Sequence, residues 1–317
     1  MSGEAILVAV DGPNAGEWVE AFRAQDGGRP VRVWPHEIGA REDIGVACVW
    51  RAPHGLLATL PNLKLIVNLG AGVDYLLADP TLPDVPIVRA ADPDLSMRVT
   101  EYVVLHTLRY HRRQPLYDAQ QRQQVWHVHP QPAASEVAVG VMGLGVIGGE
   151  AARVLARIGF KVAGWSASAK AIDGVETFHG AAGLDAFLAR TEILICLLPL
   201  TAATTAILDR TLFAKLKRDG AAGGAFLINA GRGRLQVDAD ILAALDDGTL
   251  AGATLDVFPH EPLPPESPMW THPNVTVTPH NAGDILPGIL AAQVMQQIGR
   301  LERGEPLRGL VDRTRGY

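Results

Sequence analysis

The sequence predicts an α/β protein built from two doubly wound parallel sheets. Short runs rich in β-branched residues alternate with helix-like segments through the first hundred residues, and a second series of the same kind begins near residue 137. Such alternation is typical of parallel strands joined by crossover helices. The length of 317 residues corresponds to about two domains of ~150 residues each. We therefore expect two domains, each with its own sheet and core.

The first series contains short apolar runs that we expect to form strands at Ala5–Val10, Val31–Trp34, Val46–Trp50, Leu63–Leu69 and Val85–Arg89. From Thr100 to about Gln124 the chain becomes polar and amphipathic and is broken by Pro115, which predicts a pair of connecting helices. Pro130 and Pro132 then mark a linker.

The second series predicts strands at Val137–Met142, Val162–Trp165, Ile193–Leu197, Ala225–Asn229, Ala253–Val257 and Val275–Thr278. Residues Leu286 to Leu301 carry an apolar stripe at helical spacing. We expect this last helix to pack on the first domain, because its stripe needs an apolar partner.

Composition excludes several classes of protein. Lys and Arg number 28 against 34 Asp and Glu, so the net charge of −6 gives no overall field for nucleic acid or anionic lipid. No apolar stretch approaches the ~18 residues of a membrane span. The N-terminus lacks the basic start of a secretory signal, and Cys48 and Cys196 lie in apolar runs typical of buried free thiols. We expect a cytoplasmic protein that binds neither nucleic acid nor membrane.

Metal binding is not expected. His127 and His129 are separated by one residue, but no cysteine or acidic cluster nearby completes a set of ligands.

A glycine-rich loop follows the first strand of the second series and leads into a helix-forming run. In this strand–turn–helix context, Gly143 permits a tight turn, Gly145 lets a pyrophosphate approach the backbone, and Gly148 allows close packing of helix on strand. The helix N-terminus offers N–H groups to phosphates. The alternative is a glycine turn without a ligand. The residues of the loop that we expect at the cofactor are Gly143, Leu144, Gly145, Val146, Ile147 and Gly148.

In proteins that bind NAD, the strand after the glycine loop usually ends with an acid about 20 residues beyond the first glycine, and this acid bonds the ribose 2′-hydroxyl. Ser166 occupies that place, beside Trp165. Ser166, Ser168 and Lys170 can instead receive a 2′-phosphate, so the sequence favours NADP(H), with NAD(H) possible. The alternative is a solvated loop that does not discriminate.

Charged or titratable residues follow three later strands, at the sheet edge where open α/β folds bind ligands. The segments are Ile228–Gly233 with Arg232, Leu255–Pro262 with Asp256 and Glu261, and Thr278–Ala282 with His280. Together with the glycine loop they contain, in order, N-A-x-R-G, L-D-V-F-x-x-E-P and T-P-H. The sequence thereby resembles the D-isomer-specific 2-hydroxyacid dehydrogenases over almost its whole length. Glu261–Pro268 and Leu69–Asp74 are most similar to the glyoxylate/hydroxypyruvate reductase A branch.

The resemblance implies a role for each matching position. His280 would donate a proton to the substrate oxygen, and Glu261 would orient its ring and favour its protonated form. Arg232 would clamp the substrate carboxylate or polarise the keto oxygen. The loop Leu69, Gly70, Ala71 and Gly72 would bind that carboxylate through backbone N–H groups, unless it is an ordinary glycine turn. Further cofactor contacts are implied for Leu198, Pro199, Thr204, Ala230 and Asp256, the last facing the nicotinamide carboxamide.

Trp50 can wall a small substrate pocket or simply pack in the core. Trp126 corresponds to an aromatic residue that in related reductases can approach the active site of the partner subunit. Ala167 stands where the branch commonly has Arg, which weakens the preference for NADP(H) without reversing it.

Together with these residues, the resemblance implies NADPH-dependent reduction of glyoxylate or hydroxypyruvate in a cleft between two Rossmann-like domains. The flavodoxin-like substrate domain would comprise residues 1–99 plus 283–317, and the dinucleotide-binding domain residues 100–282, through which the family implies a homodimer. The alternatives are a dehydrogenase for a larger 2-oxo acid, a nucleotide-sensing protein on the same fold, and a methyltransferase suggested by the glycine loop alone.

Overall fold

The computed structural model describes residues 4–11, 15–89, 93–284 and 286–316. It divides into two units, Met1–Pro93 with Ile285–Tyr317 and Asp94–Asp284. The sequence placed the boundaries at 99/100 and 282/283. The first lies earlier in the structure because the connecting helix α3 (Pro93–His111) begins seven residues before Thr100.

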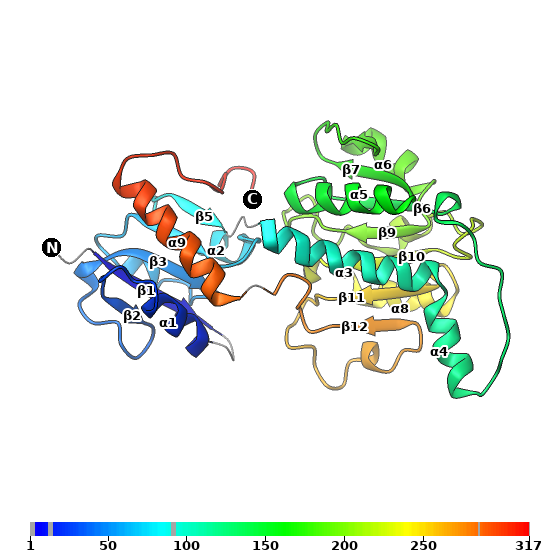
Figure 1. The fold of residues 1–317 in the computed structure, drawn as a ribbon, viewed down its shortest axis with the longest axis horizontal. Coiled ribbons are helices and arrows are strands. Elements are labelled where there is room, and N and C mark those ends of the chain that lie inside the picture. The colour runs from blue at the N-terminus through cyan, green and yellow to red at the C-terminus, as the bar shows by residue number, and fades with distance from the viewer. Residues whose placement is uncertain (1–3, 12–14, 90–92, 285, 317) are drawn as a thin grey trace. The chain divides into compact units, whose positions relative to one another are not determined.

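The first unit contains a parallel five-stranded sheet (Figure 1). Its order, β2-β1-β3-β4-β5, is that of flavodoxin-like folds. The strands are β1 (Ala5–Val10), β2 (Val31–Val33), β3 (Ile44–Trp50), β4 (Leu65–Asn68) and β5 (Ile87–Arg89). The helices are α1 (Ala15–Arg23), α2 (Asp74–Leu77) and α9 (Pro287–Glu302).

Helix α9, near the end of the sequence, lies against α1 of the first unit. Gln25 Nε2 donates to the carbonyl of Gly288 at 2.8 Å, and Arg29 pairs with Glu302 at 2.6 Å. The buried residues of α9 repeat at helical spacing, at Leu290, Ala291, Val294 and Ile298.

The second unit contains a parallel seven-stranded sheet of order β12-β11-β10-β9-β6-β7-β8. This is the Rossmann order extended by one strand. All strands are parallel, and the order in which the chain adds strands to the sheet reverses between β6 and β9. The strands are β6 (Ala138–Met142), β7 (Lys161–Ser166), β8 (Glu176–His179), β9 (Ile193–Cys196), β10 (Phe226–Asn229), β11 (Gly252–Leu255) and β12 (Val275–Val277). The helices after α3 are α4 (Gln114–Arg122), α5 (Val146–Ile158), α6 (Gly180–Leu188), α7 (Arg210–Phe213) and α8 (Asp238–Asp246).

The predicted fold class is confirmed, and so are the predicted strands to within a few residues. Strand β8 was not predicted, because its Glu-Thr-Phe-His sequence lacks the apolar run of a central strand and lies at the sheet edge. Both cysteines are free and buried, and burial raises the pKa of both thiols, that of Cys196 to about 12. None of the helices in the described ranges is long and apolar enough to cross a membrane.

Candidate active site and cofactor-binding loops

Two glycines of the loop after β6 are required by the protein itself. Gly143 has φ +101°, and a Cβ there would lie 2.6 Å from the carbonyl oxygen of Leu197, which follows β9. A Cβ on Gly148 would lie 1.8 Å from the carbonyl oxygen of Gly143. Only glycine therefore permits this turn and brings α5 close to it.

Gly145 differs from these two glycines. Its φ of −74° suits any residue, and no heavy atom lies within 4 Å of a Cβ built on it. Gly145 is exposed and directly precedes α5. Because glycine has no side chain, it does not cap the first N–H groups of this helix. The free space and the helix N-terminus suit the close approach of an anionic group from outside the chain, as a dinucleotide pyrophosphate requires.

The four positions that follow β7, residues 167–170, are exposed and include no carboxylate. Ser166 is buried and its Oγ donates to the carbonyl of Ser168 at 2.8 Å, whereas Ala167, Ser168 and Lys170 are exposed. The Trp165 side chain lies in the core, where its Nε1 donates to the carbonyl of Gly180, so its indole is not available at the surface. Trp165 meets the glycine turn through its carbonyl, which accepts from the N–H of Gly143 at 2.8 Å.

The Thr204 hydroxyl joins two parts of the loop after β9. Thr204 Oγ1 donates to the carbonyl of Pro199 at 2.7 Å and accepts from the N–H of Thr201 at 2.8 Å. Leu198 is buried and Pro199 half-buried. In the glycine turn after β6, Val146 is 77% exposed and Ile147 is half-buried.

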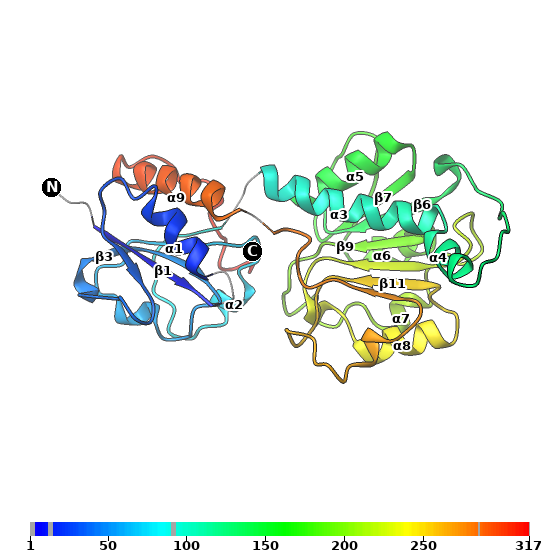
Figure 2. The ribbon, with the colours of Figure 1, turned by 60° about the horizontal axis from the view of Figure 1, so that its bottom comes forward.

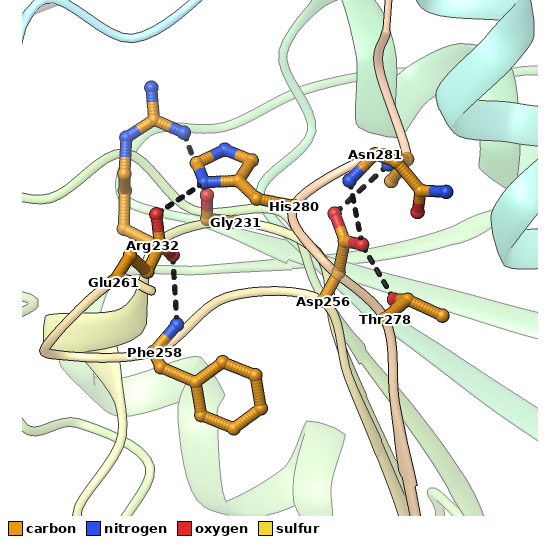
Figure 3. A network of polar contacts seen from close by, with 9 residues as sticks. Gly231, Arg232, Asp256, Phe258, Glu261, Thr278, His280 and Asn281 are labelled. Atoms are coloured by element: carbon orange, nitrogen blue, oxygen red, sulfur yellow. Dashed lines mark hydrogen bonds and ion pairs between the residues drawn. The ribbon is translucent and has the colours of Figure 1, made fainter. Parts of the chain in front are cut away.

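The predicted acid–histidine pair is formed. His280 Nδ1 lies 2.8 Å from Glu261 Oε2, and the other carboxylate oxygen accepts from the N–H of Phe258 at 3.0 Å (Figure 3). The His280 and Glu261 side chains are 29% and 15% exposed. Because Nδ1 is engaged, Nε2 is the ring nitrogen that can exchange a proton with a substrate.

Asp256 holds the turn that carries His280. Its Oδ1 accepts from Thr278 Oγ1 at 2.6 Å and from the N–H of Asn281 at 3.0 Å, and its Oδ2 accepts from the N–H of Ala282 at 3.0 Å. Its carbonyl accepts from the N–H of His280 at 2.9 Å. Asp256 is 1% exposed. The resemblance implies that its carboxylate faces the nicotinamide, and in the structure both carboxylate oxygens accept hydrogen bonds from within the protein.

The Arg232 loop follows β10 and is shaped by Asn229. The Asn229 amide donates to the carbonyl of Arg232 at 3.2 Å, and its oxygen accepts from the N–H of Gly231 at 3.1 Å. A Cβ on Gly233 would lie 1.9 Å from the Phe258 carbonyl carbon, so this loop lies directly against the loop that carries Glu261. Figure 3 shows the Arg232 side chain extending to the same side of these loops as His280. Ala230, just before this loop, is half-buried.

In the first unit, the loop after β4 is organised by Asn68. Its Nδ2 donates to the carbonyls of Gly70 at 2.7 Å and Gly72 at 2.9 Å, and its side chain is buried. The N–H of Leu69 donates to the carbonyl of Val49 at 2.9 Å. Leu69 was expected to bind an anion through its N–H, but this N–H is already bonded to Val49 of β3. The N–H groups of Gly70, Ala71 and Gly72 are the remaining candidates.

Trp50, at the end of β3, covers this loop. A Cβ on Gly70 would lie 2.0 Å from Cζ3 of its indole, and Trp50 is half-buried. The tryptophan is thus neither a plain core residue nor freely exposed, and its ring lies over the backbone that precedes Ala71 and Gly72.

Three residues that shape the site were not predicted to do so: Asn68, Asn229 and Thr278. The signal was available for the two asparagines, because each ends a strand directly before a glycine-containing loop and an amide there can bond the loop backbone.

Among the described residues no cluster of three or more His, Cys, Asp or Glu side chains could hold a metal ion. The rings of His127 and His129 lie 4.6 Å apart, and His129 also meets Gln120 at 2.9 Å. Trp126, in the same extended segment, is 98% exposed.

Comparison with known proteins places these features in one family. Residues 104–282 match the model of the D-isomer specific 2-hydroxyacid dehydrogenase, NAD binding domain. A glyoxylate/hydroxypyruvate reductase A of Yersinia enterocolitica is 40% identical over 309 residues, which cover 96% of each chain, and that of Serratia proteamaculans is 42% identical over 310 residues, 96% of this chain and 97% of the other.

Solved structures agree. The NADPH-dependent glyoxylate/hydroxypyruvate reductase of Sinorhizobium meliloti, in complex with NADP and sulfate, is 46% identical with a TM-score of 0.94, covering 99% of this chain and 100% of the other. A D-isomer specific 2-hydroxyacid dehydrogenase of Xanthobacter autotrophicus, in complex with NADPH and MES, is 42% identical with a TM-score of 0.93 over 100% of both chains. The chain therefore belongs to the D-isomer-specific 2-hydroxyacid dehydrogenase family, whose members are NAD(P)-dependent oxidoreductases.

Proposed function

We propose that this chain catalyses the NADPH-dependent reduction of small 2-oxo acids, converting glyoxylate to glycolate and hydroxypyruvate to D-glycerate. The observation that carries the proposal is the 2.8 Å contact between His280 Nδ1 and Glu261 Oε2, because a histidine held in this way presents Nε2 as a proton donor. The names of the Yersinia and Serratia relatives support the substrate class.

The proposed cofactor is NADP(H), with NAD(H) as the alternative. Gly145 and the α5 N-terminus offer space and N–H groups for the pyrophosphate. Exposed Ser168 and Lys170 can bond a 2′-phosphate, and no acid stands at Ser166, Ala167 or Ser168 to repel it. The Sinorhizobium and Xanthobacter structures, which contain NADP or NADPH, support this assignment.

In the proposed mechanism, bound NADPH supplies the hydride that adds to the carbonyl carbon of the 2-oxo acid. His280 gives its Nε2 proton to the carbonyl oxygen as negative charge develops there, and later regains a proton from water. Glu261 holds Nδ1, which fixes the ring orientation and balances the positive charge of the protonated ring. The hydride and this proton together account for the two hydrogens gained by the product.

Substrate binding is assigned to two loops. The Arg232 guanidinium is planar and permanently charged, so it can clamp the substrate carboxylate or polarise the keto oxygen. The N–H groups of Gly70, Ala71 and Gly72 would bind the carboxylate, with Trp50 as the wall that limits the size of the substrate.

We further propose a homodimer through the cofactor domain, where the 98% exposed Trp126 offers an aromatic surface to a partner. A reducing cytoplasm suits the two buried free thiols. Light scattering on the purified protein measures the oligomeric state directly, and a monomeric mass would remove the dimer.

The test of function is the loss of nicotinamide absorbance with glyoxylate, hydroxypyruvate, pyruvate and a longer branched 2-oxo acid, each with NADPH and with NADH. Rapid NADPH oxidation with the first two acids is expected. Turnover of the longer acid alone would favour a dehydrogenase for larger substrates. Cofactor binding without oxidation of any acid would favour a nucleotide-sensing protein.

A further inference from the structure

Helix α3 carries two tyrosines that each reach a threonine of the sheet. Tyr102 Oη lies 2.7 Å from Thr278 Oγ1, just after β12, and Tyr110 Oη lies 2.7 Å from Thr254 Oγ1 within β11. The tyrosines are eight residues apart, about two turns, so they lie on one face of α3. Figures 1 and 2 both show α3 running along the sheet of the second unit.

The hydrogen bonds of Thr278 have a definite direction. Its Oγ1 lies 2.6 Å from Asp256 Oδ1, and an ionised carboxylate only accepts hydrogen bonds. Thr278 must therefore give its one proton to Asp256. The bond to Tyr102 then uses a lone pair of Thr278, so Tyr102 is the donor. The order is Tyr102 to Thr278 to Asp256.

This series ends on the residue that positions His280. The Asp256 carboxylate binds the N–H groups of Asn281 and Ala282, and its carbonyl binds the N–H of His280. His280 has φ +55°, a left-handed conformation that is uncommon for a non-glycine residue. The hydrogen bonds from His280, Asn281 and Ala282 to Asp256 hold the turn in which it lies.

The environment of Tyr102 keeps its hydroxyl a donor. Burial raises its pKa, so the phenol stays protonated. The ring of His106 lies 4.4 Å from that of Tyr102. Burial, with Arg109 nearby, lowers the pKa of His106 to about 4, so a neutral ring packs on the tyrosine at neutral pH.

We propose that Tyr102 is a positioning residue for the proton donor His280, acting through Thr278 and Asp256. The inference rests on the proposed function for its kinetic consequence, whereas its structural consequence can be measured without turnover. Tyr110 supplies the matched control, because it makes a tyrosine–threonine bond from the same helix, and its threonine, Thr254, is not among the residues whose side chains bond Asp256 in the described structure.

The test compares Tyr102→Phe with Tyr110→Phe. Each variant loses one tyrosine–threonine bond, and Tyr110→Phe, whose bond is the more deeply buried, should lose at least as much thermal stability as Tyr102→Phe. Only Tyr102→Phe should lower kcat, by about tenfold, because a small misplacement of a catalytic group has a large effect on rate. NADPH affinity should stay within about twofold of the wild type in both.

The second readout is the imidazole NMR signal of His280, identified by its loss in His280→Gln. It should shift in Tyr102→Phe and stay in place in Tyr110→Phe. An unmoved signal, or equal kcat in the two variants, would overturn the proposal. If the wild type turns over no 2-oxo acid, the proposed function fails and the NMR comparison alone decides the role of Tyr102.

A second pair of variants tests the same route if Tyr102→Phe folds poorly. Thr278→Ser keeps the hydroxyl and should retain kcat and the His280 signal, whereas Thr278→Val removes the hydroxyl and should change both. Equal behaviour of the serine and valine variants would contradict the proposed route through Thr278.

Discussion

Replacement of Gly145 by alanine should separate cofactor binding from folding. Gly145 has a φ that alanine adopts without strain, and no heavy atom lies within 4 Å of the added methyl position. The chain therefore gives no reason for glycine there. If a pyrophosphate approaches this backbone, the methyl group must push it away.

The magnitude follows from the contact that is lost. A hydrogen bond from a backbone N–H to a charged oxygen is worth about 1.5–3 kcal/mol. Its loss weakens the Kd for NADPH by about 10- to 150-fold, since each ~1.4 kcal/mol is a factor of ten. The free energy of unfolding should stay the same or rise by about 0.4–1 kcal/mol, because alanine restricts the unfolded chain.

The assay is a fluorescence titration with NADPH beside urea denaturation of the same protein. Gly149→Ala is the matched control: Gly149 lies in the first turn of α5, the helix that Gly145 precedes, and its Cβ would make an ordinary 3.5 Å contact with Ile172. This control should bind NADPH with the Kd of the wild type. An unchanged Kd for Gly145→Ala would contradict a pyrophosphate contact at this backbone, and a large fall in its unfolding midpoint would show that the chain itself requires glycine there.

Three further outcomes are expected. Gly233→Ala places a methyl 1.9 Å from the Phe258 carbonyl carbon and must part the two loops of the site, so kcat should fall about 100-fold and stability by about 1–3 kcal/mol, measured by steady-state kinetics and urea denaturation. Asn68→Ala frees two loop carbonyls and should raise the KM for the 2-oxo acid about tenfold with little change in kcat; an unaltered KM would exclude this loop from binding. Burial raises the pKa of the Cys48 and Cys196 thiols, so neither should react with a thiol reagent at pH 8 until the protein is denatured, and rapid labelling of the native protein would contradict their burial.

The strands were predictable from sequence because those at the centre of parallel sheets are continuous apolar runs. Ile193–Cys196 is fully buried and could be identified by composition alone. Strand β8, Glu176–His179, pairs only with β7 at the edge and carries polar residues, so its register depends on the neighbouring strand rather than on its own pattern. Helix α3 was predicted from Thr100 but begins at Pro93, whose place in the first turn is one that proline tolerates.

The candidate site was only partly predictable. Arg232, Glu261 and His280 lie in short ordered motifs, and the structure brings the last two into contact. The residues that support them could not be found in that way. Tyr102 and Thr278 are 176 positions apart in the sequence, and their contact depends on where α3 crosses the sheet.

The role of His280 as proton donor is tested most directly by the rate of NADPH oxidation with glyoxylate by the wild type, His280→Gln and His260→Gln. His260 is exposed one residue before Glu261, so its variant controls for loss of a histidine in the same region. His280→Gln should lower kcat by about 100-fold or more, as loss of a general acid does, with NADPH affinity retained and His260→Gln close to the wild type. Near-normal turnover by His280→Gln would contradict the role of His280 as proton donor.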